Sequence, residues 1–144
     1  MNAAIDIART GAALGELGIG AIVVDADYNC IAARHDEVRS SRDPLRHAGL
    51  LALRDAAAIM ESWRLLGCEL VVTREPCALC AGAALSARLR RVIVGAVDLQ
   101  FGCLGSRYNL GSDPRLNHEF EVSYMGSPEL ASSVYATSIG GSPL

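Results

Sequence analysis

The chain has 144 residues, enough for one domain with a core of its own, and 51% of them are hydrophobic. It contains no apolar run near the roughly 18 residues of a transmembrane helix, and no secretory signal pattern opens it, so we expect a cytoplasmic protein without membrane contact. The net charge of −3 gives no overall attraction for nucleic acid, so any contact with RNA must be local.

The first half of the chain predicts a helix, a hairpin and a second helix. Apolar residues recur at steps of three and four over residues 2–15, as in an amphipathic helix. Two apolar runs, 19–24 and 30–33, flank a polar turn and predict two paired strands. The segment 35–46 has no hydrophobic period, so we expect a loop that leads into a helix over 47–60.

The second half predicts alternating strands and helices. A β-rich run at 70–73, an alanine-rich helix over 77–88 and a buried-strand pattern at 91–96 indicate a βαβ unit with two parallel strands. A long loop over 98–118 and a last strand over 119–124 follow. We therefore predict a folded domain over 1–125 and a Ser- and Gly-rich tail over 126–144, with at most a short helix near 129–135 and a disordered end.

Two cysteines, Cys77 and Cys80, open the predicted helix 77–88. Residues three apart lie on one face of a helix and can bind one metal ion, and the helix N-terminus favours the thiolate form. His47, at the start of the helix 47–60, is the expected third ligand. One His and two Cys leave a fourth tetrahedral position for water, which is typical of catalytic zinc. A Cys-x-x-Cys pair by itself also occurs in redox proteins and in structural zinc sites.

The sequence around these ligands resembles the bacterial tRNA adenosine deaminases, which are cytidine deaminase-like zinc enzymes. Of the zinc deaminase signature, His-x-Glu followed by Pro-Cys-x-x-Cys, the chain has the histidine at 47 and the Pro-Cys-x-x-Cys at 76–80, but not the glutamate. Further similar stretches are 42–44 with 47–48, 52–54, 75–83, 91–96 and 117–118, and the resemblance covers roughly residues 2–125. It implies a three-layer α/β/α fold with a mixed sheet of about five strands, a homodimer, and conversion of adenosine to inosine at the wobble position of tRNA.

The resemblance also implies a set of substrate-binding positions: Asp36, Ala48, Pro76 and Asp98. Asp98 stands where the family has an aspartate near the substrate backbone, although a loop-capping role is an alternative. Asp36 replaces an asparagine that hydrogen-bonds the base and the ribose. An ionised carboxylate can only accept hydrogen bonds and would repel N7 of adenine, so this position departs from the family.

Five arginines surround the expected metal ligand His47: Arg34, Arg39, Arg42, Arg46 and Arg54. Because arginine suits bidentate phosphate contacts, we predict that Arg39, Arg42 and Arg46 bind a tRNA anticodon stem-loop. The alternative is a solvated charge network with the nearby acidic residues Asp36, Glu37, Asp43 and Asp55.

Gly49 stands two residues after His47, where the family has its catalytic glutamate. That glutamate takes a proton from the attacking water and returns it to the substrate, and glycine can do neither. We therefore predict an inactive or strongly impaired chain, with a loss on the order of 10²–10⁴ or more in rate. Besides the tRNA deaminase lineage, two functions stay open: a guanine- or cytosine-type small-molecule deaminase, and a non-catalytic tRNA-binding subunit or engineered inactive variant.

Overall fold

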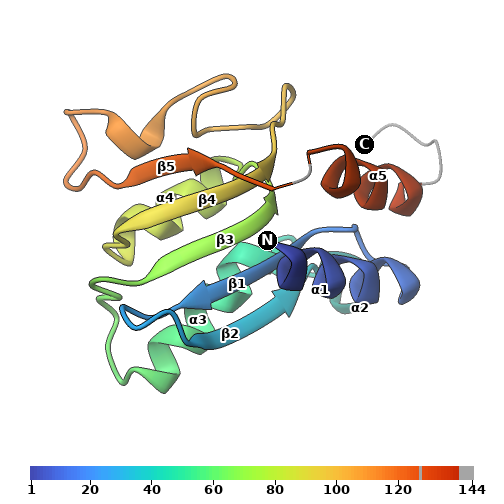
Figure 1. Ribbon diagram of the computed structural model, residues 1–144, viewed down its shortest axis with the longest axis horizontal. Helices are drawn as coiled ribbons and strands as arrows, with labels where there is room; N and C mark the ends of the chain where they lie inside the picture. The colour runs from blue at the N-terminus through green and yellow to red at the C-terminus, as the bar shows by residue number, and fades with distance from the viewer. Residues whose placement is uncertain (127, 140–144) are drawn as a thin grey trace.

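The computed structural model describes residues 1–126 and 128–139, and its centre is a five-stranded mixed sheet (Figure 1). The strands are β1 (Gly20–Val24), β2 (Cys30–His35), β3 (Glu69–Arg74), β4 (Arg91–Ala96) and β5 (Glu121–Tyr124), in the spatial order β2-β1-β3-β4-β5. β1 pairs antiparallel with β2 and β3, whereas β3, β4 and β5 are parallel. The predicted hairpin, βαβ unit and mixed sheet are confirmed.

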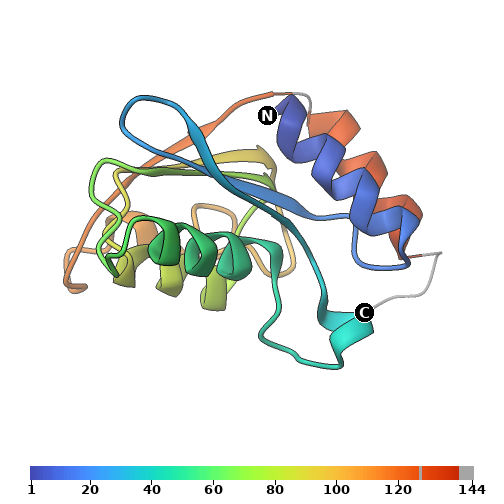
Figure 2. The same cartoon turned by 90° about the horizontal axis from the view of Figure 1, so that it is seen from below.

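Helices cover both faces of the sheet, which confirms the three-layer α/β/α architecture (Figure 2). α3 (Ala48–Ile59) and α4 (Ala78–Ser86) lie on one face, and α1 (Asn2–Ala13) and α5 (Pro128–Ser138) lie on the other. Side chains alternate along β3, so Leu70 and Val72 enter the main core under α3 and α4 while Val71 packs in a smaller cluster under α1. None of the described helices has the length and apolar character needed to cross a membrane.

The segment between β2 and α3 contains a short helix where the sequence predicts a loop. This helix, α2 (Val38–Ser41), is too short for a hydrophobic period. The buried carboxylate of Glu16 accepts hydrogen bonds from the backbone N–H groups of Arg39 (2.9 Å) and Ser40 (2.7 Å). A residue distant in sequence therefore satisfies the free N–H groups at the start of α2.

The tail differs most from the expectation. α5 covers Pro128–Ser138, longer than the short helix expected near 129–135, and its buried side chains are Ala131, Val134 and Tyr135. Val134 packs in one cluster with Ile5 and Ala8 of α1. The expected disordered end falls partly on residues 140–144, which lie outside the described residues. α5 is thus packed against the fold and reaches the site described next.

Candidate metal centre and its cavity

Two helices begin at the expected metal ligands. His47 is the N-cap of α3 and Cys77 the N-cap of α4, and both have extended backbones with ψ of 143° and 176°. Their carbonyls accept the first helical hydrogen bonds, from the N–H groups of Leu51 and Ala81, each at 2.9 Å. Cys80 lies one turn into α4. The ligands therefore sit where free N–H groups and helix dipoles favour negative charge.

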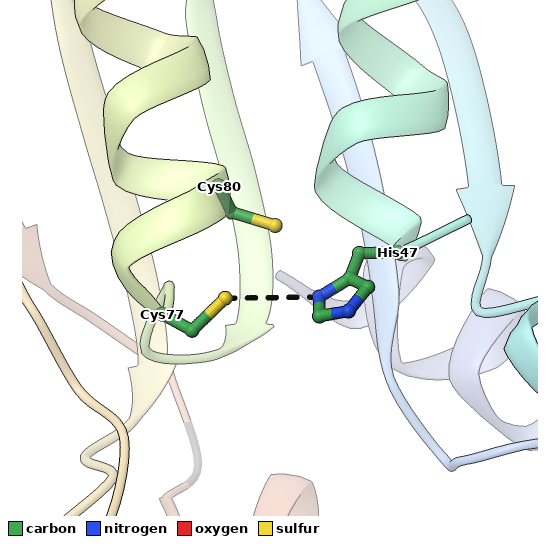
Figure 3. Close-up of side chains that lie close together, drawn as sticks. All are labelled: His47, Cys77 and Cys80. Carbon is green, nitrogen blue, oxygen red and sulfur yellow. Dashed lines mark hydrogen bonds between the residues drawn. The ribbon is translucent and has the colours of Figure 1, made fainter. Parts of the chain in front are cut away.

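The three ligand atoms converge between the two helices (Figure 3). His47 Nδ1, Cys77 Sγ and Cys80 Sγ lie within 4.8 Å of one another, and Cys77 Sγ is 3.7 Å from His47 Nδ1. Zinc with Zn–S bonds of about 2.3 Å and Zn–N bonds of about 2.0 Å separates tetrahedral ligand atoms by about 3.5–3.8 Å. The donor set thus fits zinc. In the described part of the chain, no fourth ligating side chain joins this cluster.

The ionisation of the three ligands is coupled. A hydrogen bond from the Cys80 thiol, aided by the contact with His47, lowers the pKa of Cys77 to about 4 despite burial. The contact with Cys77 raises the pKa of Cys80, and it also raises the pKa of His47. Cys77 is therefore a thiolate at neutral pH, which is the form of cysteine that ligates metal.

A cavity of about 340 Å³ opens beside the ligands. All the predicted substrate-binding positions line it, as does Gly49. Its other lining residues are mainly apolar and come from the segment after α1, from β3, from the loop after β4 and from α5: Leu17, Ile19, Leu70, Val72, Phe101 and Tyr135. The volume lies at the lower end of the range for small-molecule sites, about 300–1,000 Å³.

Gly49 is buried in the first turn of α3, at the wall of this cavity. A Cβ atom added to it would lie 3.6 Å from Cys80 Sγ and 3.8 Å from Leu70 Cδ2, which are ordinary van der Waals contacts. Its φ is not in the left-handed region, so the backbone does not require glycine. Neither the packing at the Cβ position nor the backbone conformation therefore requires a glycine here.

The two aspartates of the cavity are buried, and both accept hydrogen bonds from other residues of the chain. Asp36 is only 1% exposed, its Oδ1 accepts the Val38 N–H at 3.2 Å, and burial raises its pKa. Asp98 is 4% exposed, and its Oδ2 accepts the Nε–H of Arg74 at 2.7 Å. Although burial opposes ionisation, this bond and two backbone N–H groups hold the pKa of Asp98 below its usual value. The two N–H groups belong to Gln100 and Phe101, and both donate hydrogen bonds to Asp98 Oδ1. The loop-capping role expected as an alternative for Asp98 is therefore observed.

Glu75 anchors the loop that follows β4. Its carboxylate accepts hydrogen bonds from the N–H groups of Asp98 (3.0 Å), Leu104 (2.9 Å) and Ser106 (3.0 Å), and from the Ser106 hydroxyl. These donors outweigh burial and hold the pKa of Glu75 below its usual value. Both carboxylate oxygens of Glu75 therefore accept hydrogen bonds from within the protein.

The arginines predicted to bind RNA do not line the cavity. Arg39 donates from Nη1 to the carbonyls of Gly15 (3.0 Å) and Ser138 (3.1 Å), and so connects the end of α1 to the end of α5. Arg46 pairs with Glu37, as the charge-network alternative expected. Arg42 is exposed, with a left-handed backbone (φ 54°).

Sequence reasoning missed several residues of the cavity wall, and among them are Arg74 and Tyr135, which carry polar groups. Arg74 ends β3 on the same face as Leu70 and Val72, so the alternation of side chains along the strand could have indicated it. Tyr135 belongs to α5, far along the chain, and no local pattern places it at the cavity.

Comparisons with known proteins agree with this geometry. Residues 1–96 match the model of the cytidine and deoxycytidylate deaminase zinc-binding region. The tRNA-specific adenosine deaminase of Haemophilus influenzae is 40% identical over 122 residues, which are 85% of this chain and 70% of that protein.

Two solved structures are similar as well. A chain from a study of A-to-I editing by tRNA:A34 deaminases at the wobble position superposes with a TM-score of 0.88 and 32% identity, covering 93% of this chain and 96% of that one. Guanine deaminase from Bacillus subtilis superposes with a TM-score of 0.63 and 33% identity, covering 67% and 61%. The chain belongs to the cytidine and deoxycytidylate deaminase family, and within it to the group of the tRNA-specific adenosine deaminases.

Proposed function

We propose that this chain binds zinc through His47, Cys77 and Cys80 and holds an adenosine of a tRNA anticodon stem-loop beside it. The observation that carries the proposal is the convergence of these three ligands at two helix N-termini, beside a cavity, in a chain 40% identical to a tRNA-specific adenosine deaminase. Zinc held there would supply Lewis-acid activation of water for hydrolytic deamination, in which ammonia leaves C6 and inosine forms. By analogy with the family, the assembly is a homodimer.

The side chains of this cavity bind and enclose the substrate but do not provide the proton transfer. Ala48 and Pro76 line the wall next to the ligands, and the apolar lining excludes water from the bound base. The carboxylates of Asp98 and Glu75 accept hydrogen bonds from other parts of the chain. At Gly49 no carboxylate is present, so the chain retains a deaminase site whose catalysis is lost or strongly impaired.

Two other functions each have an observation in their favour. The buried carboxylate of Asp36 and the 33% identity to a guanine deaminase favour a guanine- or cytosine-type small-molecule deaminase. Gly49 favours a non-catalytic tRNA-binding subunit, or equally an engineered inactive variant.

The test compares Gly49→Glu with the unmodified chain in ammonia release from an anticodon stem-loop, adenosine, cytidine and guanine. The space beyond Gly49 accepts a Cβ, so we expect the new carboxylate to raise the rate on the stem-loop by a factor on the order of 10²–10⁴. Gly49→Gln, with the same shape but no acid–base function, is the matched control and should remain inactive.

Each result has a definite meaning. Turnover of the unmodified chain at an ordinary rate of about 1 s⁻¹ or more would show that our account of Gly49 is wrong. Activity of Gly49→Glu on guanine or cytidine alone would support the small-molecule alternative. No activity on all four substrates would support the non-catalytic binding subunit.

A further inference from the structure

We propose that Arg74 binds a phosphate group of the ligand in this cavity, so that the ligand is a nucleotide, either free or within RNA, and not a bare base or nucleoside. The inference rests on the proposed function only in that the cavity takes a nucleobase compound beside the metal ligands. It concerns which part of that compound the chain recognises.

Arg74 occupies the carboxyl end of β3, directly before the segment that carries the ligands. It shares the face of β3 that presents Leu70 and Val72 to the cavity, and Cys77 follows three residues later. Ligands of open α/β sheets bind outside the carboxyl ends of parallel strands, and β3 and β4 are parallel at this point. The guanidinium therefore stands at the wall of the cavity, near the metal ligands in the chain.

Two contacts hold the guanidinium of Arg74 in place. Its Nε donates to Asp98 Oδ2 at 2.7 Å, and its Cζ lies 3.8 Å from the centre of the Tyr135 ring. The ion pair fixes one edge of the planar group and the ring covers one face. A guanidinium that is ordered in this way loses little entropy when it binds an anion.

The terminal nitrogens of Arg74 remain available. Among the described residues, the hydrogen bonds of this side chain are limited to Nε, and neither Nη1 nor Nη2 is found as a buried atom without a partner. The side chain is 17% exposed and lines the cavity. A fork of N–H donors matches two oxygens of a phosphate, which gives the strong, charge-assisted form of the contact.

No other arginine lines this cavity in the described parts of the chain. Arg39 is bound to the carbonyls of Gly15 and Ser138, and Arg46 is paired with Glu37. Asp98 accepts hydrogen bonds from Nε of Arg74 and from two backbone N–H groups, and Glu75 is held by backbone N–H groups and the Ser106 hydroxyl. Nη1 and Nη2 of Arg74 are therefore not used by either carboxylate. A phosphate that enters the cavity with a base therefore finds its donors at Arg74.

The test measures, by calorimetry on the zinc-loaded protein, the affinity for four ribonucleosides, their 5′-monophosphates and an anticodon stem-loop. Arg74→Gln should weaken binding of the phosphate-bearing ligands by about 10- to 100-fold and change binding of the nucleosides by less than about threefold. A loss with the monophosphates identifies a free nucleotide, and a loss with the stem-loop alone identifies a phosphodiester. Arg54→Gln removes an exposed arginine outside the cavity and should change none of these affinities.

Arg74→Lys provides a second variant if the glutamine form does not fold. It keeps the charge but loses the fork, and the phosphate-bearing ligands should again be weakened more than the nucleosides. Equal weakening of nucleosides and nucleotides would mean that Arg74 only supports the loop at Asp98, and would overturn the inference. It would also be overturned if Arg74→Gln bound all ligands normally, or if the unmodified chain bound no nucleotide at low salt.

The experiment tests recognition of the base and recognition of the phosphate separately. If only cytosine or guanine nucleotides bind, and their affinity falls in Arg74→Gln, the adenosine function fails and this inference stands. If adenosine and the stem-loop bind equally well with and without Arg74, this inference fails and the proposed function stands.

Discussion

Three side chains from two helix starts form the candidate metal centre, and one of them is more buried than the other two. Cys80 is 6% exposed and is the most enclosed of the three, while His47 and Cys77 are half-buried. All three ligands line the cavity together with Gly49, and a Cβ at Gly49 would lie 3.6 Å from Cys80 Sγ. Removal of the enclosed ligand should therefore abolish retention of the metal.

The matching prediction concerns Cys80→Ala. We expect about one zinc per unmodified chain and less than about 0.3 per chain for Cys80→Ala, because three ligands are the minimum for a site of this type. Elemental analysis of freshly purified protein provides the measurement. Cys103→Ala is the control, since Cys103 is also buried but lies outside the cluster and should retain the metal. Full zinc retention by Cys80→Ala would contradict the site.

Gly49 also permits a prediction about stability. Glycine within a helix costs up to about 1 kcal/mol relative to alanine, and a Cβ at Gly49 meets its neighbours at ordinary contact distances. Gly49→Ala should therefore raise the free energy of unfolding by about 0.5–1 kcal/mol in urea titrations. At Gly20 a Cβ would approach the carbonyl oxygen of Ala4 to 2.1 Å, so Gly20→Ala should destabilise by about 1–3 kcal/mol. If both variants shifted stability in the same direction, the packing argument would fail.

At the scale of elements, α2 depends on a carboxylate outside its own sequence. Glu16 is buried and accepts the N–H groups of Arg39 and Ser40. Burial raises the pKa of Glu16, but these bonds outweigh it and the pKa lies below its ordinary value of 4.5. The stabilisation is therefore complete above the unfolded pKa of about 4.5 and is lost as the pH falls through the lower, folded pKa.

The variant Glu16→Gln should lose this pH dependence. At pH 7 we expect it to be less stable than the unmodified chain by about 1–2 kcal/mol, and the difference should shrink as the pH is lowered towards about 3. Urea unfolding at several pH values between these limits measures the difference. Parallel curves for the two proteins would show that the Glu16 carboxylate does not hold α2. Because α2 precedes His47, zinc content at pH 7 is a useful second measurement.

At the scale of the whole molecule, RNA binding has to overcome a net charge of −3. Of the three arginines predicted to bind phosphates, Arg42 is exposed, whereas Arg39 and Arg46 already contact other parts of the chain. Each new phosphate contact must therefore compete with an existing one at two of these positions. The interface is expected to be local and sensitive to salt.

We predict that affinity for an anticodon stem-loop falls steeply as salt rises. Replacement of Arg39, Arg42 and Arg46 by glutamine should reduce the slope of log affinity against log salt by about 0.7–0.9 for each phosphate contact that is lost. Fluorescence anisotropy between low and physiological salt measures the slope. A slope unchanged by the triple replacement would place the RNA elsewhere, and no binding at low salt would favour a small base or nucleoside.

The amino-acid sequence by itself determined the central βαβ unit of this protein and indicated its candidate metal ligands. The apolar strand runs 70–73 and 91–96, with the helix between them, are local patterns, and they fold as β3, α4 and β4. The candidate ligands could also be predicted from local patterns, since Cys77 and Cys80 are one helical turn apart and His47 begins a helix. Such features depend on neighbours within a few residues, which any correct fold must respect.

Only the tertiary structure decided what surrounds those ligands. Tyr135 reaches the cavity because α5 packs beside α1. The carboxylate of Asp98 is hydrogen-bonded because β3 places Arg74 next to it. Glu16 stabilises α2 across a gap of more than twenty residues in the chain. These contacts join segments that are distant in sequence, and their energies depend on burial and on which donors remain unpaired after packing. No periodicity or motif encodes them, because each partner alone is an ordinary polar or aromatic residue.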